Sequence, residues 1–203
     1  MKKLIIIGAG GHGKVVADIA QKSGYNEIEF LDSVQTGDCM GFPIVDKCDN
    51  VEKYIDKADF FVAIGNTVAR EKYISLLLSM GANLITLIHP SSVIDKSVTI
   101  GRGTVVMAGV VVNSSTKIGQ GVIINTSSSI DHDCEVADYC HVSVGVHVAG
   151  TVNIGKRTWL GIGAIISNNL SICDDCMIGA GSLVLKNVTE SGTYYGSPVR
   201  KIR

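Results

Sequence analysis

One short segment of the chain places a histidine between two acids, in the order Asp131, His132, Asp133. An imidazole, with an ordinary pKa of about 6.5, can accept a proton at neutral pH. A carboxylate beside it can fix its tautomer and raise its basicity. The segment therefore predicts that His132 acts as a general base. The alternative is that His132 is a solvated turn residue without a chemical role.

A second segment, GAGGHG at residues 8–13, fits the glycine pattern of a phosphate-binding turn. It directly follows an apolar run at 3–7 and precedes a helical pattern, so backbone N–H groups at the helix start can approach phosphate oxygens. His12 and Lys14 stand where their side chains could reach the same anion, and Asp32 follows about 20 residues later. Two alternatives remain, an NAD site and a packing turn without a ligand.

The elements around this turn alternate between strand and helix over residues 3–88. The apolar patterns predict strands at 3–7, 27–31, 60–64 and 84–88, and helices at 13–22 and 70–80. We therefore predict a small Rossmann-like unit with a parallel sheet. A unit of under 90 residues is half the size that a dinucleotide usually needs, which disfavours NAD. Pro90 marks the expected boundary between domains at 1–90 and 91–203.

From residue 94 onward the apolar period changes to six. Sixteen successive sixth positions, from Ile94 to Val184, are all Ile, Leu or Val. This pattern predicts a solenoid in which three hexads form one coil of 18 residues and residues 18 apart stack in columns. Gly150 then stacks over His132, and Asn168 stacks over Gly150. The small residue beside the base is expected to leave room for a substrate atom.

Composition narrows the function classes. The formal net charge is −1 and 18% of residues are charged, so no basic field favours nucleic acid. The apolar run after MKK is too short for a secretory signal, and no stretch approaches a membrane span of about 20 residues. We expect a cytoplasmic protein with six reduced, mostly buried cysteines. Cys173 and Cys176 lack a second pair or a histidine in register, so no metal site is expected.

The hexads closing with YYGSPVRKI resemble the hexapeptide-repeat acyltransferases. Together with IIGAGGHGK, EFLD, VAIGN and SIDHDC, they resemble the sialic-acid O-acetyltransferase group, which includes N-acetyltransferases of nucleotide-linked 4-amino sugars. The resemblance implies an α/β Rossmann-like unit followed by a left-handed parallel β-helix. It also implies a homotrimer with active sites at subunit interfaces and acetyl-CoA as cosubstrate.

The resemblance further assigns roles to individual residues. The implied catalytic residues are His132, Asp133, where the group usually has Glu, and His141, for which lining the trimer seam is the alternative. Because Trp159 follows His141 by 18 residues, the two rings are expected to stack. The implied acetyl-CoA contacts are the Gly150 backbone N–H, which would meet the thioester oxygen, and Ile162, Gly163, Ala180 and Lys186. The implied nucleotide-sugar contacts are Gly10, Gly11, His12, Lys14, Asp32 and Asn66.

The function that follows is transfer of an acetyl group from acetyl-CoA to the amine of a UDP- or dTDP-linked 4-amino-6-deoxy sugar, by direct attack. O-acetylation of a sugar such as a sialic acid is a close alternative. A metalloenzyme of the γ-carbonic-anhydrase kind, using His132, His141 and His147 as ligands, is an alternative of another class.

Overall fold

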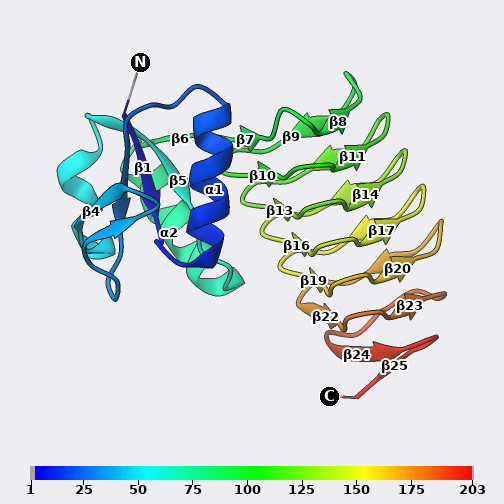
Figure 1. Cartoon of the computed structure of the whole chain (residues 1–203). Coiled ribbons are helices and arrows are strands. Elements are labelled where there is room, and N and C mark those ends of the chain that lie inside the picture. Colours follow the sequence, from blue (N-terminus) through cyan, green and yellow to red (C-terminus); the bar gives the residue numbers. More distant parts are fainter. Residues whose placement is uncertain (1–2, 203) are drawn as a thin grey trace. The chain divides into compact units, whose positions relative to one another are not determined.

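The computed structural model describes residues 3–202 and divides the chain into two compact units between His89 and Pro90. Figure 1 shows an N-terminal unit of helices and a sheet, followed by a ladder of short strands that continues to the C-terminus. Each unit is described in turn.

The N-terminal unit is built on a twisted sheet with the strand order β3-β4-β2-β1-β5-β6. All neighbouring strands are parallel except β3 and β4. Its elements are β1 (Lys3–Ile7), α1 (Gly11–Lys22), β2 (Ile28–Leu31), β3 (Asp38–Cys39), β4 (Phe42–Asp46), the 3-10 helix η1 (Cys48–Tyr54), β5 (Ala58–Val62), α2 (Thr67–Ser79), β6 (Asn83–Leu84) and β7 (Leu87–Ile88).

The parallel Rossmann-like sheet is confirmed, with differences at its margins. The prediction of one strand over 84–88 is wrong, because β6 ends at Leu84 after pairing with β5 and β7 is a separate strand. The elements β3, β4 and η1 were not predicted. Every residue of β5 is buried, as expected for a central strand of a parallel sheet.

The C-terminal unit is a left-handed parallel β-helix with the predicted 18-residue coil. Val105 lies opposite Ile123, which lies opposite His141, and the other coil strands repeat this spacing. The coil strands are β8 (Val93–Ile94), β9 (Thr99–Ile100), β10 (Val105–Val106), β11 (Val111–Val112), β12 (Lys117–Ile118), β13 (Ile123–Ile124), β14 (Ser129–Ile130), β15 (Glu135–Val136), β16 (His141–Val142), β17 (His147–Val148), β18 (Asn153–Ile154), β19 (Trp159–Leu160), β20 (Ile165–Ile166), β21 (Ser171–Ile172), β22 (Cys176–Ile178) and β23 (Leu183–Val184). Two further strands, β24 (Gly192–Gly196) and β25 (Val199–Lys201), pair antiparallel at the end.

The three faces of the β-helix are three separate ladders. One contains β8, β11, β14, β17, β20 and β23, and a second contains β9, β12, β15, β18 and β21. The third runs from β10 through β13, β16, β19 and β22 to β24 and β25. All inward sixth positions are buried except Ile94 and Ile100, which lie in the first coil and are only half-buried. The core is therefore a column of branched side chains that stack coil on coil.

The corners between the faces need a left-handed backbone at every sixth residue. Glycine fills some of these positions, but the others have non-glycine residues with φ near +60°: Ser115, Ser127, Asp133, Tyr139, Thr151, Arg157, Asn169 and Asp175. Such a residue costs roughly 1–3 kcal/mol unless its surroundings hold it. Each of these corners is held by a hydrogen bond to the preceding coil. For example, the N–H of Asp133 donates to the carbonyl of Ser114 at 3.0 Å, and the N–H of Thr151 donates to the carbonyl of His132 at 2.9 Å.

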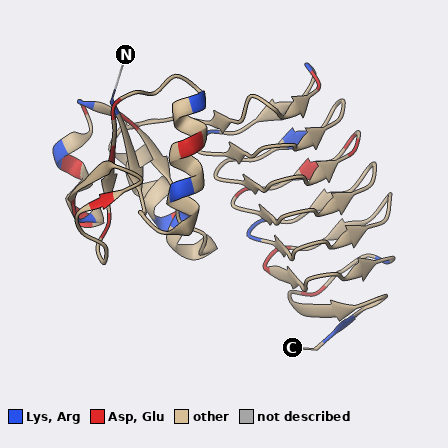
Figure 2. Ribbon diagram, in the orientation of Figure 1, with Lys and Arg blue, Asp and Glu red and all other residues tan. Residues whose placement is uncertain are grey.

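Charged side chains are unevenly distributed along the chain. Figure 2 shows few Lys, Arg, Asp or Glu on the coil strands, whereas α1 carries both signs and β25 is basic. Within residues 3–202, no helix is long and apolar enough to cross a membrane.

Candidate active site

The predicted base and its acidic neighbour lie on the corner between β14 and β15. The Nδ1 atom of His132 is 2.9 Å from Oδ2 of Asp133, and both side chains are more than half exposed, at 54% and 59%. Asp133 has φ +56°, a conformation that Asp tolerates better than most residues. With Asp133 ionised, Nδ1–H donates to the carboxylate, and Nε2 is left with a free lone pair. The pair therefore has the arrangement of an oriented general base.

The electrostatics of this corner favour the protonated imidazole. The hydrogen bond that His132 donates to Asp133 is the main cause that raises the pKa of His132, and the charge of Asp131 adds to it, while burial acts in the opposite direction. A raised pKa means a stronger base, but one that is free only at a higher pH. Proton uptake at Nε2 is therefore stabilised by two nearby carboxylates.

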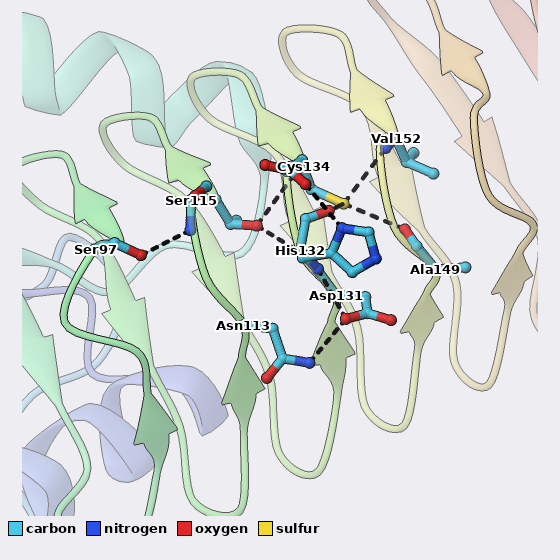
Figure 3. A network of polar contacts seen from close by, with 10 residues as sticks. Ser97, Asn113, Ser115, Asp131, His132, Cys134, Ala149 and Val152 are labelled. Carbon is cyan, nitrogen blue, oxygen red and sulfur yellow. Dashed lines mark hydrogen bonds and ion pairs between the residues drawn. The ribbon is translucent and has the colours of Figure 1, made fainter.

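The second carboxylate, Asp131, has a different position from Asp133. Its Oδ1 accepts from the backbone N–H of His132 at 2.8 Å and from the Nδ2 amide of Asn113, one coil earlier, at 2.9 Å. The Asn113 hydrogen bond is the main cause that lowers the pKa of Asp131, and the His132 N–H adds to it. Figure 3 shows this chain of contacts running from Asn113 through Asp131 to His132.

A buried column supports the same corner from inside the coil. The hydroxyl of Thr116 donates to the carbonyl of Asp131 at 2.7 Å and accepts from the N–H of Cys134 at 3.1 Å. The thiol of Cys134 donates to the carbonyl of Ala149 at 3.2 Å and lies 3.4 Å from the N–H of Val152. Backbone groups on both sides of His132 are thus fixed by buried side chains (Figure 3).

Gly150 lies against the imidazole, as the 18-residue column predicts. A Cβ built on Gly150 would lie 2.6 Å from both Cε1 and Nε2 of His132, which is too close for any side chain. The space that the glycine was expected to leave for a substrate atom is therefore occupied by the imidazole itself. Gly150 is needed for the position of the ring.

The second histidine of the prediction, His141, is on β16 and hence on a different face from β14 and β15. Its ring stacks on Trp159 with centroids 5.4 Å apart, which confirms the predicted pair. Its Nε2 is 3.4 Å from the amide nitrogen of Asn125. Trp159 is itself fixed by a 2.6 Å hydrogen bond from its indole N–H to Ser143. Within one chain, His141 thus belongs to a separate cluster from His132.

The residues expected to contact acetyl-CoA lie on two corners. Lys186 continues the column of His132 and Gly150 and is exposed. Ile162, Gly163 and Ala180 lie on the next corner, where Ile162 is 63% exposed and a Cβ on Gly163 would meet open space. The face between the two corners is the ladder that contains β14, β17 and β20.

A shallow pocket of about 240 Å³ lies on this face, and it was not predicted. Asp131 and Asn113 form one end of it, beside the base, and Ile165 contributes an apolar wall. Ser129 and His147 also line it and hydrogen-bond to each other at 2.8 Å through Nδ1 of the histidine. The pocket joins a polar end next to His132 to a surface that an apolar chain could contact.

In the N-terminal unit, the four glycines of the turn fall into two kinds. A Cβ on Gly8 would lie 2.9 Å from the carbonyl oxygen of Ala63, and one on Gly13 would overlap the carbonyl oxygen of Gly8. Gly10 and Gly11 have nothing within 4 Å of such a Cβ. Helix α1 begins at Gly11, and no side chain caps it. The first kind is required for packing, and the second leaves the helix N-terminus open to an anion.

Asp32 and Asn66 have structural partners in the loops. The Asp32 carboxylate accepts from Ala9 N–H at 2.7 Å and from the N–H groups of Val34 and Gln35 at 2.8 Å. Burial acts to raise the pKa of Asp32, but these three hydrogen bonds outweigh it and lower the pKa. Asn66 caps α2 by accepting from Ala69 N–H at 3.0 Å. Both side chains therefore shape loops at the carboxyl edge of the sheet.

His12 is neutral, and its neighbour Arg70 was not predicted. Burial, followed by the charge of Arg70, lowers the pKa of His12 to about 4, and its buried Nε2 has no hydrogen-bond partner in the structure. Arg70 is 1% exposed, and its Nη1 donates to the carbonyls of Ile64 and Gly65 at 3.0 and 2.8 Å. Lys14 is exposed one position after the turn. Lys14 thus offers an exposed positive charge beside the turn, whereas the charge of Arg70 is buried.

No cluster of three or more His, Cys, Asp or Glu side chains within residues 3–202 is arranged to hold a metal ion. The three histidines of the metalloenzyme alternative lie on two faces and one corner of the coil.

Residues 3–77 match the PglD N-terminal domain family. The chain is 34% identical over 114 residues to UDP-N-acetylbacillosamine N-acetyltransferase of Bacillus subtilis (strain 168), a match that covers 53% of this chain and 52% of that one. It thus spans about half the length of that relative.

A longer match is to GDP-perosamine N-acetyltransferase of Escherichia coli O157:H7, with 30% identity over 157 residues, covering 73% of this chain and 71% of that one. Among solved structures, the acetyltransferase domain of PglB from Neisseria gonorrhoeae FA1090 in complex with acetyl coenzyme A has a TM-score of 0.97 and 35% identity, and covers 99% of both chains.

Proposed function

Since the chain belongs to the family of N-acetyltransferases that act on nucleotide-linked amino sugars, we propose that it transfers an acetyl group from acetyl-CoA to the amine of a nucleotide-linked 4-amino-6-deoxy sugar. The observation that carries this proposal is the His132–Asp133 pair, set against Gly150 on a rigid coil. Relatives whose names specify UDP- and GDP-linked substrates support the substrate class and leave the nucleotide open.

In this mechanism His132 is the only proton carrier that the reaction needs. Nε2 takes the proton from the sugar amine as its nitrogen attacks the thioester carbonyl carbon, and Asp133 stabilises the imidazolium that forms. The backbone N–H of Gly150 donates to the carbonyl oxygen, where negative charge develops. When the tetrahedral intermediate collapses, His132 returns the proton to the departing CoA sulfur. No covalent bond to the enzyme is formed.

The residues proposed to bind the nucleotide belong to the N-terminal unit. Gly10 and Gly11 bind the diphosphate through backbone N–H groups, Lys14 adds a positive charge, and His12 donates from a neutral ring. Asp32 and Asn66 act mainly through the loops that they hold, and these loops contact the nucleoside. The open helix N-terminus at Gly11 supports this assignment.

The acetyl-CoA arm lies along the face between the two corners of the coil. Ile162, Gly163 and Ala180 leave room for the pantetheine chain, and Lys186 pairs with a phosphate. His141 belongs to the acceptor site of a neighbouring subunit, because within one chain it lies on another face. We therefore propose a homotrimer with active sites at subunit interfaces, and a cytoplasmic location would supply acetyl-CoA.

The test is a screen for release of the CoA thiol. The purified protein is incubated with acetyl-CoA and a panel of UDP-, dTDP- and GDP-linked 4-amino-6-deoxy sugars, with the free amino sugars and a sialic acid as controls. We expect thiol release with at least one nucleotide-linked amine and a new amide in the NMR spectrum of the product. Release with hydroxyl acceptors alone would contradict the proposal and favour O-acetylation.

The assembly is tested separately by light scattering coupled to size exclusion. A mass three times that of the chain is expected. The Trp159→Ala variant tests whether the stack of His141 on Trp159 contributes to this assembly. An active monomer would contradict sites shared between subunits.

A further inference from the structure

The last complete coil contains two thiols in contact. Cys173 and Cys176 are both free, and their Sγ atoms are 3.4 Å apart. They flank one corner, between β21 and β22, with Asp174 and Asp175 between them. Cys173 is partly exposed, whereas Cys176 is buried. Neither residue has a part in the proposed acetyl transfer, so the pair needs its own explanation.

Other buried cysteines of the β-helix show what is different about this pair. Cys134, Cys140 and Cys176 occupy the same position in their hexads. The thiols of Cys134 and Cys140 donate to carbonyl oxygens of the next coil at 3.2 and 3.0 Å. The corresponding contact of Cys176, to the carbonyl of Glu190, is 3.6 Å. The Cys176 thiol is thus held less closely by the backbone, and its nearest sulfur or oxygen contact is Cys173.

The corner that carries the two thiols is fixed from the preceding coil. Asp175, which has φ +58°, receives two hydrogen bonds from the Arg157 guanidinium, at 2.6 and 2.5 Å. Asp174 accepts from the N–H of Lys156 at 2.8 Å. Thr158 donates to the carbonyl of Cys173 at 2.9 Å and accepts from the N–H of Cys176 at 3.3 Å. Because the backbone on both sides is anchored, the two sulfur atoms are held face to face.

We propose that Cys173 and Cys176 form a thiol-modification site that closes to an intramolecular disulfide by exchange with a low-molecular-weight disulfide such as oxidised glutathione. The sulfur atoms must approach from 3.4 Å to about 2 Å, which side-chain rotation can provide. The partly exposed Cys173 is the attacking thiol and the buried Cys176 is the resolving one.

The exchange takes place in two balanced steps. The Cys173 thiolate attacks one sulfur of the glutathione disulfide, the glutathione S–S bond breaks, and the first glutathione leaves and takes up a proton. Cys176 then gives its proton to solvent and attacks Cys173 Sγ, which releases the second glutathione. Two protein thiols are oxidised and one glutathione disulfide is reduced to two thiols. In the reduced pair, burial and then the neighbouring thiol raise the pKa of Cys176 to about 12, which disfavours Cys176 as the first attacking thiol.

The experiment uses the full chain and peptide mass spectrometry. Trypsin releases Cys173 and Cys176 together on peptide 158–186, and Cys134 and Cys140 together on peptide 118–156, so the second peptide is an internal control. The reduced protein is incubated with glutathione disulfide, quenched with an alkylating agent and digested. We expect peptide 158–186 to lose two hydrogens and to take up no alkyl group, while peptide 118–156 keeps two reduced thiols.

Two variants fix the order of attack. Cys176→Ser is expected to stop at a stable mixed disulfide between Cys173 and glutathione, and Cys173→Ser is expected to leave Cys176 reduced. The acetyl-transfer rate of both variants should equal that of the wild type, which also reports that they fold. The proposal is overturned if wild-type peptide 158–186 stays reduced or retains glutathione, or if peptide 118–156 is oxidised to the same extent.

Discussion

Glycines are important in both units, but for different structural reasons. In the N-terminal turn, Gly10 and Gly11 leave backbone N–H groups open at the start of α1, and nothing lies near the positions that a Cβ would take. On the β-helix, Gly150 is packed against the ring of His132. The first region therefore offers backbone to a ligand, whereas the second uses a missing side chain to position another one.

The two units have different parts in the proposed reaction. Beside the turn, the Asp32 carboxylate is occupied by three N–H groups of the protein itself. The polar side chains of the His132 corner remain half exposed on a rigid coil. Changes to the turn should alter substrate binding, and changes to the corner should alter the chemical step.

The largest effect among the glycine variants is expected for Gly150→Ala. The new Cβ would lie 2.6 Å from Nε2 and Cε1, so the imidazole must turn away from its position beside Asp133. Misplacement by about 1 Å can cost roughly 100-fold in rate, and we expect a fall in kcat of that order with little change in KM. Steady-state kinetics measure this fall, and an unchanged kcat would show that Gly150 does not position the His132 ring.

The next largest effect is a loss of stability, which is expected for the Gly13→Ala variant. Its Cβ would overlap the Gly8 carbonyl oxygen, so helix and strand must separate. Overpacking of this kind costs about 1–3 kcal/mol, and thermal unfolding should shift to lower temperature. A stability equal to the wild type would mean that the packing role assigned to this glycine is wrong.

Gly11→Ala is the matched variant from the same turn, with an intermediate effect. Its Cβ meets open space, so the fold and its unfolding temperature should not change. Because a methyl group would stand where the diphosphate is proposed to bind, we expect KM for the nucleotide sugar to rise by about tenfold, equivalent to 1.4 kcal/mol, with kcat preserved. A lower kcat at unchanged KM would instead place this turn in the chemical step.

The smallest effect is a shift in pH dependence for Asp133→Asn. Asn tolerates the left-handed conformation at this position, so the corner should keep its shape. The Asp133 hydrogen bond raises the pKa of His132, so its loss lowers that pKa and frees the base at lower pH. The acidic limb of the kcat/KM profile should therefore move to lower pH, together with a reduced maximum. A limb that stays in place would show that another group titrates there.

Much of the fold follows from periodicity alone. The six-residue pattern predicts the 18-residue spacing of the coils, and with it the contact between His132 and Gly150 and the stack of His141 on Trp159. Such local repetition is read directly from the sequence because each coil contacts only its neighbours.

Other features depend on contacts that no period encodes. Tyr139 and Arg157 occupy left-handed corners, where propensity alone would place Gly or Asn, because hydrogen bonds to the previous coil hold them. Arg70 reads as a surface residue of an amphipathic helix, but it is buried against two loop carbonyls. The short strands β3 and β4 have no clear alternation. In the N-terminal turn, the three hydrogen bonds that the Asp32 carboxylate accepts from loop N–H groups are evident only in the folded chain.

In the proposed reaction the imidazole of His132 accepts the proton of the attacking amine, and the His132→Asn variant is the sharpest test of this role. The variant removes the base and keeps a polar side chain of similar size beside Gly150. With saturating acetyl-CoA and the best amine from the substrate panel, kcat should fall by roughly 10²–10⁴-fold. The KM for the sugar should stay near the wild-type value. A variant that turns over within a few-fold of the wild type would contradict the account.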